Sequence, residues 1–381
     1  MNKMEKKDYQ IGDEIRTWSV CIPDNAGKEV EKTLKSTWIN TGKKEKEFRE
    51  KICNRFKAPF ATATTSGTNA LKIALKSIGI GPGDEVVSTP YTFMATNTAI
   101  LELGAKPVFA DIQYDTLNID PISVAEKITS KTKAIMCVHY AGNAVDLNEL
   151  RDVASSHNLP IIEDSAHAMA TEYQGMPIGS TGDMACFSFQ CVKIVTCGDG
   201  GVVTTTNKEL HEKMQKISWY GINRDAKKLD ILDPLPHSPD GLGLKANMND
   251  IIATLACSAI DYLDTALEVR FKYGKIYREE LGSLTKIKLM NYKEDRKPNY
   301  QIFPVHVENR KKFAEYMWSK GIQVNINNRR NDIYEMFGGL QKDLKNLEKA
   351  DNDVILIPMH NDLNDNDVSR IVDTIKVYDS Q

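Results

Sequence analysis

Lys193 and Asp164 are the two residues whose types and positions could support catalysis. Lys193 follows a mostly apolar run, Cys186–Val192, and precedes a turn rich in glycine at 198–201. Asp164 ends another apolar run, Leu159–Glu163, 29 residues earlier in the chain. A lysine that forms a Schiff base and a carboxylate that faces a pyridinium nitrogen are what pyridoxal phosphate (PLP) requires of its protein. The pair therefore predicts PLP chemistry with Lys193 and Asp164 as catalytic residues.

Each of these two residues also has an ordinary structural interpretation. A lone lysine is usually a solvated surface charge, and an aspartate before Ser165 could be the N-cap of a helix. Phe187 and Phe189 indicate that the lysine is buried, and burial lowers the pKa of an amine, which makes it a nucleophile and a proton shuttle. Open α/β sheets bind ligands at the carboxyl ends of their strands, where we expect Asp164.

A candidate phosphate site lies at Ser66-Gly67-Thr68, where a helix is expected to begin. Backbone N–H groups at a helix start, a glycine that allows close approach and two hydroxyl groups together favour an anion. Ser188, five residues before Lys193, is a further donor. Alone this motif would most often be a helix cap; together with the lysine it predicts a phosphate cradle.

Two other side chains could contact the ring of a cofactor. Phe93 follows an expected strand and could stack on a planar ring, although a core aromatic is equally consistent with its position. His167, three residues after Asp164, could likewise be a core histidine. No metal site is predicted, because Cys191 and Cys197 are six residues apart and no second pair accompanies them.

The elements that must position these residues follow an alternating pattern. Between residues 45 and 206, strand-like apolar runs alternate with helical periodicity, which predicts an α/β fold with a mostly parallel sheet covered by helices. Apolar residues at 71, 74, 75 and 78 predict an amphipathic helix over 68–78 that ends at Gly79. The predicted strands span residues 85–88, 106–112, 134–140, 159–164 and 200–206.

The chain is predicted to have three parts. These are an N-terminal arm at 1–30, a large PLP-binding domain at 31–255 and a small C-terminal α/β domain at 256–381. A loop is expected at 225–242, and a helical stretch at 249–281 should link the two domains. Strands of the small domain are expected at residues 300–307 and 353–358.

Composition excludes several classes of partner. Among 381 residues, 49 Lys and Arg face 52 Asp and Glu, so the near-balance gives no reason to expect nucleic acid or an anionic membrane as a partner. No apolar run approaches the roughly 20 residues of a membrane span, and the N-terminus has no signal-peptide core. Seven cysteines, an odd number, predict reduced thiols and a cytoplasmic location.

The motifs, in this order, resemble those of the DegT/StrS family of sugar aminotransferases, which are PLP enzymes of fold type I. The resemblance covers nearly the whole chain and is strongest to enzymes that make 4-amino-4-deoxy sugar nucleotides. The matching segments are Trp38–Gly42, Ser66–Thr68, Thr92–Thr96, Val138–Gly142, Glu163–Ala168 and Phe187–Gly201. Such a series of motifs is specific to this family.

The resemblance implies a fold and a set of roles. The fold would be a large domain with a mostly parallel seven-stranded sheet wrapped by helices, plus a smaller C-terminal α/β domain. Lys193 would bind PLP, Asp164 would contact the pyridinium and His167 would lie by the ring. The residues implied at the phosphate are Gly67, Thr68 and Ser188. The family also implies a homodimer with shared active sites, in which Lys245 or Asn247 would approach the phosphate of the neighbouring subunit.

The implied reaction transfers an amino group from L-glutamate to a keto-sugar, with a nucleotide-linked 4-keto-6-deoxy sugar as the expected acceptor. Surface polysaccharide, glycan or deoxyamino-sugar biosynthesis is the expected setting. The chain departs from the family pattern at Lys43, Thr98 and Asn327, all on the acceptor side, which leaves the sugar open. Arg329 and Arg330 could pair with an acidic or phosphorylated substrate, although exposed arginines are common.

Several alternatives to this reaction stay open. The acceptor could be a 3-keto-sugar, a keto-sugar without a nucleotide or a cyclitol, and synthesis of an aromatic amine precursor is also compatible with the sequence. A sugar dehydratase on the same scaffold has histidine at the lysine position, so Lys193 argues against it. A PLP-binding regulator without turnover would normally carry an added partner module, for which no segment is left.

Overall fold

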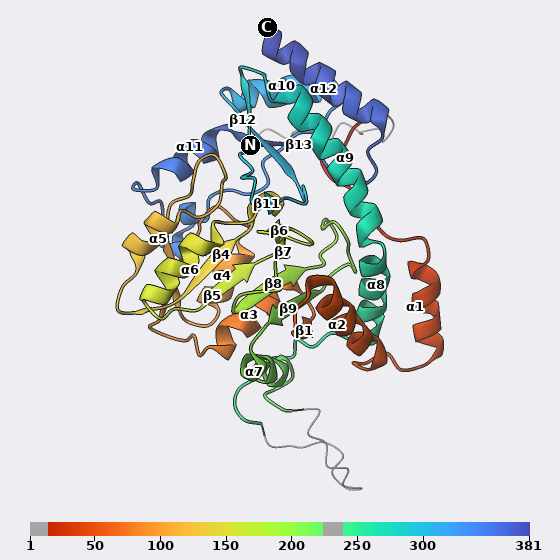
Figure 1. Cartoon of the computed structure of the whole chain (residues 1–381), viewed down its shortest axis with the longest axis vertical. Helices are drawn as coiled ribbons and strands as arrows, with labels where there is room; N and C mark the ends of the chain where they lie inside the picture. The colour runs from red at the N-terminus through yellow and green to blue at the C-terminus, as the bar shows by residue number, and fades with distance from the viewer. Residues whose placement is uncertain (1–13, 224–238) are drawn as a thin grey trace, which may run out of the picture.

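The computed structural model describes residues 14–223 and 239–381, and its largest feature is a sheet of seven strands (Figure 1). Their order is β1-β9-β8-β5-β4-β2-β3. Neighbours from β8 to β3 are parallel, while β9 is antiparallel to both β1 and β8. The bounds are β1 Phe60–Thr64, β2 Glu85–Ser88, β3 Lys106–Phe109, β4 Thr132–Val138, β5 Ile161–Asp164, β8 Met184–Ser188 and β9 Gly201–Thr205. The mostly parallel sheet confirms the predicted fold class.

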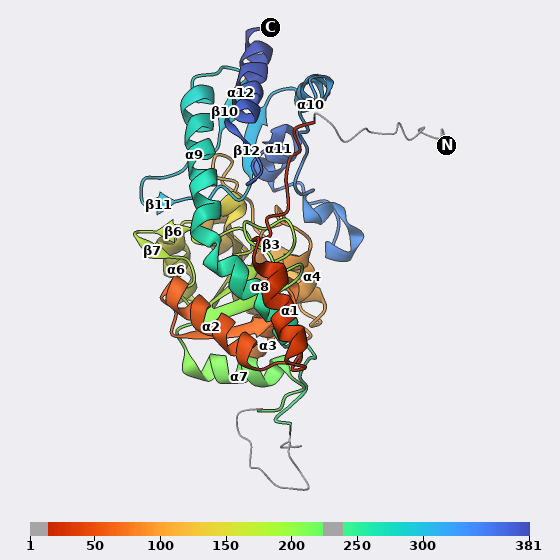
Figure 2. The ribbon, with the colours of Figure 1, turned by 90° about the vertical axis from the view of Figure 1, so that its right-hand side faces the viewer.

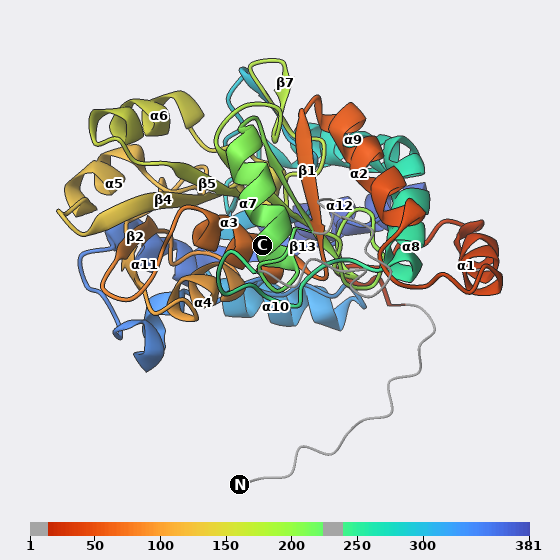
Figure 3. The ribbon, with the colours of Figure 1, turned by 90° about the horizontal axis from the view of Figure 1, so that it is seen from below.

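Helices cover both faces of this sheet (Figure 3). Successive side chains of a strand point to opposite faces, so Val86 and Ala134 pack with α3, α4 and α7, whereas Val87 and Ile135 pack with α2, α5, α6 and α8. The helices are α2 Lys43–Phe56, α3 Gly67–Ser77, α4 Ala95–Leu101, α5 Pro121–Lys127, α6 Leu147–Ser156, α7 Lys208–Ser218 and α8 Asp250–Asp261. Burial on both faces explains why the strands read as continuous apolar runs.

The elements that carry the candidate residues lie close to their predicted positions. β2 has the predicted bounds, and α3 starts and ends one residue earlier than predicted. The strand predicted over 134–140 is wrong at its end, because β4 stops at Val138. Tyr140 begins a 3₁₀ turn, η1 (Tyr140–Gly142), in which Ala141 has a φ of 58° that no strand accommodates.

A second, smaller sheet lies beyond the large one and has its own core (Figure 1). It is antiparallel, in the order β10-β12-β13, and is packed by α9, α10 and α12. The bounds are α9 Leu263–Leu281, β10 Ile287–Leu289, β12 Phe303–Val307, α10 Arg310–Ser319, η2 Asn331–Ile333, η3 Glu335–Phe337, α11 Lys345–Asp353, β13 Val354–Ile357 and α12 Asp365–Ser380. The predicted helical stretch at 249–281 is two helices, α8 and α9, that meet at Tyr262.

The division of the chain into three parts stays a prediction. α8 adds Ala256 and Ile260 to the core of the large sheet, so a boundary at residue 255 would fall inside this helix. The predicted N-terminal arm contains residues 1–13, which lie outside the described residues, and the start of α1 (Ala26–Lys35). Most of the loop predicted at 225–242 also lies outside the described residues.

Besides the α8–α9 helix pair, two further contacts link the C-terminal part of the chain to the rest. Ile15 forms a bridge with Ile322, and the chain then runs down to α1 along the side of the molecule (Figure 2). A third sheet pairs β11 (Arg296–Lys297) with β6 (Glu172–Tyr173), which also pairs with β7 (Met176–Pro177). No helix within residues 14–223 and 239–381 is long and apolar enough to cross a membrane.

Candidate active site

A cavity of about 380 Å³ lies where β5 and β8 end, between the large sheet and segments of the C-terminal part. Because these strands are parallel neighbours, their carboxyl ends meet at one edge of the sheet. The cavity brings together eight of the ten residues predicted from the sequence, namely Ser66, Gly67, Thr68, Phe93, Asp164, His167, Ser188 and Lys193. The sequence separates these residues by more than a hundred positions, so the sheet alone explains their convergence.

Lys193 lies in the turn that follows β8, where its N–H donates to the carbonyl oxygen of Gln190 at 2.9 Å. Its side chain is partly buried and lines the cavity. Burial lowers the pKa of Lys193 from 10.5 to about 8, and the nearby Asp164 carboxylate opposes part of this shift. At neutral pH a useful fraction of the amine is therefore uncharged and able to act as a nucleophile or base.

Asp164 is the last residue of β5, and its carboxylate is buried in the cavity wall. The Thr96 hydroxyl donates to its Oδ2 at 2.7 Å, and the Ala166 N–H donates to its Oδ1 at 3.1 Å. Burial raises the pKa of Asp164, and these two hydrogen bonds and the Lys193 charge limit the rise. No helix begins after Asp164, so the alternative in which it is a helix N-cap is wrong.

His167 presents a buried nitrogen without a hydrogen-bond partner. Its Nδ1 contacts no donor or acceptor among the described residues. Burial and the Lys193 charge hold the pKa of His167 well below its ordinary range, so the ring is neutral. Because an unpaired buried polar group is costly and His167 lines the cavity, this nitrogen is available to a ligand bound there.

The start of α3 forms a narrow cradle. Ser66 is the N-cap, and its hydroxyl accepts the Asn69 N–H at 3.2 Å. A Cβ added to Gly67 would lie 2.8 Å from the Ser188 Cβ, so only glycine fits between the helix start and β8. The first N–H groups of a helix have no partner within the helix. The cradle therefore offers free donors to an anion, with the Ser188 hydroxyl beside it.

Phe93 is not a core residue. It lines the cavity with 63% of its surface exposed, which removes the core interpretation and leaves its ring face available for stacking.

The model of the DegT/DnrJ/EryC1/StrS aminotransferase family matches residues 20–376, nearly the whole chain. The chain belongs to this family. Enzymes of the DegT/StrS family are PLP-dependent, and this enzyme is accordingly a PLP-dependent sugar aminotransferase. The family assignment confirms the resemblance seen in the motifs and the predicted cofactor.

Several named proteins are similar to this chain over most of its length. The UDP-4-amino-4-deoxy-L-arabinose–oxoglutarate aminotransferase of Shewanella sediminis is 32% identical, over 90% of this chain and 92% of that protein. The spore coat polysaccharide biosynthesis protein SpsC of Bacillus subtilis is 31% identical, over 92% of this chain and 93% of that protein. A protein from Streptococcus pneumoniae, solved in its PLP form, is 27% identical with a TM-score of 0.87, over 97% of this chain and 99% of that one.

The residues of the cavity fit PLP. The Gly67 cradle, which a Cβ would fill, suits a phosphate, and the buried carboxylate of Asp164 suits a pyridinium nitrogen. The lowered pKa of Lys193 suits an amine that binds an aldehyde. Each assignment remains a proposal about the individual residue, although the cofactor itself follows from the family.

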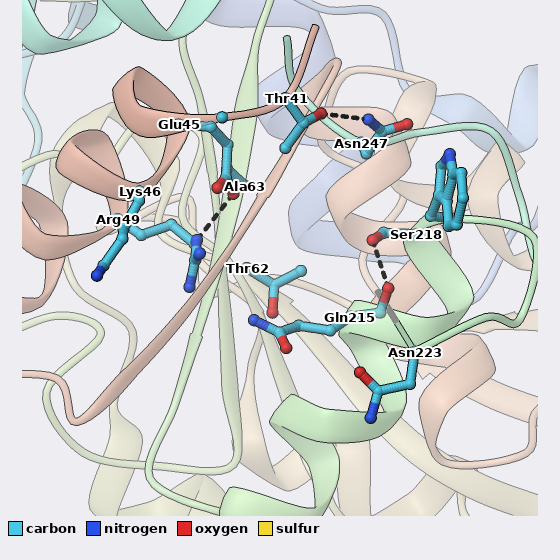
Figure 4. Close-up of a pocket in the computed structure, with 12 residues that line it drawn as sticks. Thr41, Glu45, Lys46, Arg49, Thr62, Ala63, Gln215, Ser218, Asn223 and Asn247 are labelled. Atoms are coloured by element: carbon cyan, nitrogen blue, oxygen red, sulfur yellow. Dashed lines mark hydrogen bonds and ion pairs between the residues drawn. The ribbon is translucent and has the colours of Figure 1, made fainter. Parts of the chain in front are cut away.

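Lys245 and Asn247 do not line this cavity. Asn247 lies in a second cavity of about 370 Å³, where its side chain donates to the Thr41 hydroxyl at 2.5 Å (Figure 4). The Lys245 ammonium donates to the Asn247 carbonyl oxygen, also at 2.5 Å. Within one chain the two residues therefore bond to each other, away from Lys193. Their predicted approach to a neighbouring subunit's phosphate stays a prediction.

The two arginines suggested for an acidic substrate also lie outside the lysine cavity. Arg330 is buried and forms a two-point ion pair with Asp332, with both N–O distances 2.7 Å. Arg329 lies 3.9 Å from Asp351. Instead, Asn327 from the same segment lines the cavity, as does its neighbour Asn328.

The sequence did not point to three residues that contact the predicted site. Thr96 lies in a quoted motif, but its hydrogen bond to Asp164 had no visible signal. Arg270 and Gln301 come from the C-terminal part of the chain and line the same cavity. Neither residue belongs to a motif or follows a strand in the large sheet, so the sequence contains no signal that could have found them.

Proposed function

We propose that this enzyme transfers the amino group of L-glutamate to a nucleotide-linked 4-keto-6-deoxy sugar, in surface polysaccharide, glycan or deoxyamino-sugar biosynthesis. The observation that carries the aminotransferase chemistry is that Lys193 and Asp164 line the same cavity. The similarity to an enzyme named for UDP-4-amino-4-deoxy-L-arabinose and oxoglutarate supports the nucleotide, the position of the amine and the donor. The similarity to a spore coat polysaccharide protein supports the setting.

Lys193 would hold the cofactor and then move a proton. PLP, when bound, supplies an electron sink that stabilises negative charge on the substrate carbon. The Lys193 amine, with a pKa of about 8, would take the proton from the donor's α-carbon at Nζ and deliver it elsewhere in the same site. A well-placed base of this kind contributes ~10²–10⁴-fold to the rate.

The other cavity residues would bind and orient. Asp164 would keep a proton on the ring nitrogen, because a buried carboxylate favours a cation beside it. The hydrogen bond from Thr96 holds this carboxylate in place. The start of α3 and Ser188 would anchor the phosphate, and Phe93 would contact the ring face. His167 would offer its unpaired Nδ1 to the bound molecule.

We further propose that the enzyme is a homodimer with shared active sites and works in the cytoplasm. Large apolar side chains are exposed around the cavity and the first helix, which is the kind of surface that a second subunit would cover. They include Trp18, Ile22, Leu34, Trp38 and Phe93. All seven cysteines are free thiols, which supports a reducing compartment.

The first test is the half-reaction with glutamate. Holoenzyme mixed with L-glutamate and no sugar should release one 2-oxoglutarate per site, and the visible absorbance of the cofactor should change with it. The Lys193→Ala variant should bind PLP without this reaction. A PLP-binding regulator would release no 2-oxoglutarate, and that result would refute the proposal.

The acceptor is tested separately, with a panel of keto-sugars and glutamate analysed by mass spectrometry. The panel should contain nucleotide-linked 4-keto-6-deoxy sugars, a nucleotide-linked 3-keto-sugar, a 4-keto sugar without its nucleotide and a keto-cyclitol. We expect an added amine on the nucleotide-linked 4-keto-6-deoxy sugars. Preferential amination of any other member would exclude the proposed acceptor while leaving the half-reaction intact.

A further inference from the structure

We propose that Gln301 is a positioning residue for Lys193. Its buried side-chain amide bonds to the backbone on both sides of the lysine. The Ile194 N–H donates to Gln301 Oε1 at 3.0 Å, and Gln301 Nε2 donates to the Val192 carbonyl oxygen at 3.0 Å. One side chain therefore holds the residues before and after Lys193, and it comes from a segment 107 residues further along the chain.

The segment that carries Gln301 is itself firmly anchored. The guanidinium of Arg270, which is buried, donates to the carbonyl oxygens of Tyr300 and Gln301, both at 2.9 Å. The Gln301 N–H donates to Asn299 Oδ1 at 2.9 Å. Because no ion pair engages Arg270 among the described residues, its hydrogen-bonding capacity goes to these carbonyls and to Asn361 and Met359. The amide of Gln301 is thus presented from a fixed backbone.

The same segment also holds the opposite wall of the cavity. Asn299, which is buried, donates through Nδ2 to the carbonyl oxygens of His167 and Met169, each at 2.8 Å. Residues 299–301 therefore connect the His167 loop to the Lys193 turn. This arrangement adds a second connection between the two segments beyond the ends of β5 and β8, which the large sheet already places side by side.

Positioning matters at Lys193 because the residue lies in a turn. No strand or helix includes residues 189–200. Backbone hydrogen bonds such as that from the Lys193 N–H to the Gln190 carbonyl oxygen hold part of this turn, and the Gln301 amide holds the main chain directly before and after the lysine. A displacement of about 1 Å in a reacting group can cost ~10²-fold in rate. Removing the two hydrogen bonds of the Gln301 amide should therefore lower the rate of proton transfer by displacing Lys193. The inference rests on the proposed role of Lys193.

The test compares wild-type holoenzyme with Gln301→Met, which keeps the length of the side chain and removes both hydrogen bonds. We expect kcat to fall by ~10²-fold while KM for glutamate stays within about threefold. A second readout uses the apoprotein: competitive acylation of Lys193 followed by mass spectrometry across pH. In the variant the lysine should reach solvent more easily, and the midpoint of labelling should rise by about one pH unit or more.

The matched control is Gln113→Met. The Gln113 amide also bonds at both ends, to Asp146 at 2.8 Å and to Thr116 at 2.9 Å, but it lies outside the cavity. This variant should keep wild-type kcat and the wild-type labelling midpoint, even where its melting temperature falls.

If Gln301→Met does not fold, the Gln301→Glu variant tests whether Gln301 positions Lys193. Glutamate keeps the acceptor for Ile194 and loses the donor to Val192, so it should lower kcat in a folded protein. A folded Gln301→Met or Gln301→Glu enzyme with wild-type kcat and labelling midpoint would overturn the positioning role. Loss of the glutamate half-reaction in the wild-type enzyme would instead contradict the proposed function, so the two failures are distinguishable.

Discussion

Replacing Lys193 with methionine should make the apoprotein more stable at pH 7 while abolishing its activity. The pKa of Lys193 is lowered by burial to about 8, from 10.5. At pH 7 the Lys193 side chain of the folded protein is still mostly protonated, and burial makes this positive charge unfavourable. Methionine has a similar length and no charge, so the substitution removes the cost without leaving a large cavity.

The size of the expected stabilisation follows from the difference between the folded and unfolded pKa of Lys193. A pKa difference of one unit corresponds to about 1.4 kcal/mol, so the difference between 10.5 and about 8 corresponds to about 3 kcal/mol at pH 7. The value of about 8 already includes the attraction to Asp164, which opposes the effect of burial. The folded pKa of this cation lies below the unfolded one, so the unfolded state binds more protons between pH 8 and 10.5, and wild-type stability rises across this window. At pH 10 the free-energy cost of keeping the charged Lys193 side chain buried should be below about 1 kcal/mol.

The assay is urea unfolding of PLP-free protein, followed by tryptophan fluorescence at pH 7 and pH 10. PLP must be absent, because any ligand that binds only the folded state adds its own stability. Lys288→Met, at an exposed lysine of β10, is the matched control. The free energy of unfolding of Lys193→Met should exceed that of the wild type by about 3 kcal/mol at pH 7. This difference should be smaller by about 2 kcal/mol at pH 10. Lys288→Met should show no such dependence on pH.

Two results would refute this reasoning. If Lys193→Met is no more stable than wild type at pH 7, then the ammonium is solvated and burial does not activate it. If its advantage is the same at pH 7 and pH 10, then the stabilisation comes from apolar packing and not from the removed charge. Either outcome would also remove the physical basis for Lys193 as a base near neutral pH.

Two other substitutions test the cofactor contacts. Asp164→Asn keeps the shape and removes the charge that we propose faces the ring nitrogen, so kcat should fall by ~10²-fold or more; a rate within threefold of wild type, by steady-state kinetics, would mean that the carboxylate is only structural. In Gly67→Ala the new Cβ would lie 2.8 Å from the Ser188 Cβ, so the start of α3 must move away from β8, and circular dichroism should first show that the variant is folded. We expect PLP affinity to drop by ~10-fold or more, measured by titrating the apoprotein, and unchanged affinity would place the phosphate elsewhere.

The sequence was sufficient to predict five of the seven strands of the large sheet, though not β1 or β8, and most of the residues that line the cavity, for a clear physical reason. A buried parallel strand is a continuous apolar run, and the polar residue that ends it is placed at the ligand-binding edge by the topology itself. Asp164 and Ser188 are such ends, at the last residues of β5 and β8. Lys193 and the start of α3 then follow from the strands that precede them.

The sequence could not predict the contacts of the site that form between segments far apart along the chain. Gln301 lies in a short irregular stretch before β12, and nothing in its local composition indicates that it bonds to the lysine turn. Arg330 is the reverse of Gln301, because the sequence suggested a contact that the structure does not show. Its charge suggested a substrate contact, but its side chain pairs with Asp332, two residues away. Lys245 and Asn247 likewise depend on how the segment before α8 folds back against Thr41.

Several groups in the cavity wall lack a favourable partner within the protein, either for a charge, for a hydrogen bond or for an aromatic face. Burial raises the pKa of Asp164 and lowers that of Lys193, so each charge is disfavoured where it stands despite its attraction to the other. His167 keeps a buried nitrogen without a partner, and Phe93 keeps an aromatic face exposed. The folded protein retains such costs only where the surrounding structure fixes them, and here residues 299–301 and the ends of β5 and β8 supply that rigidity. A cationic ring with an aldehyde and a phosphate would satisfy these groups together, which is the physical basis for proposing that the cofactor binds in this cavity.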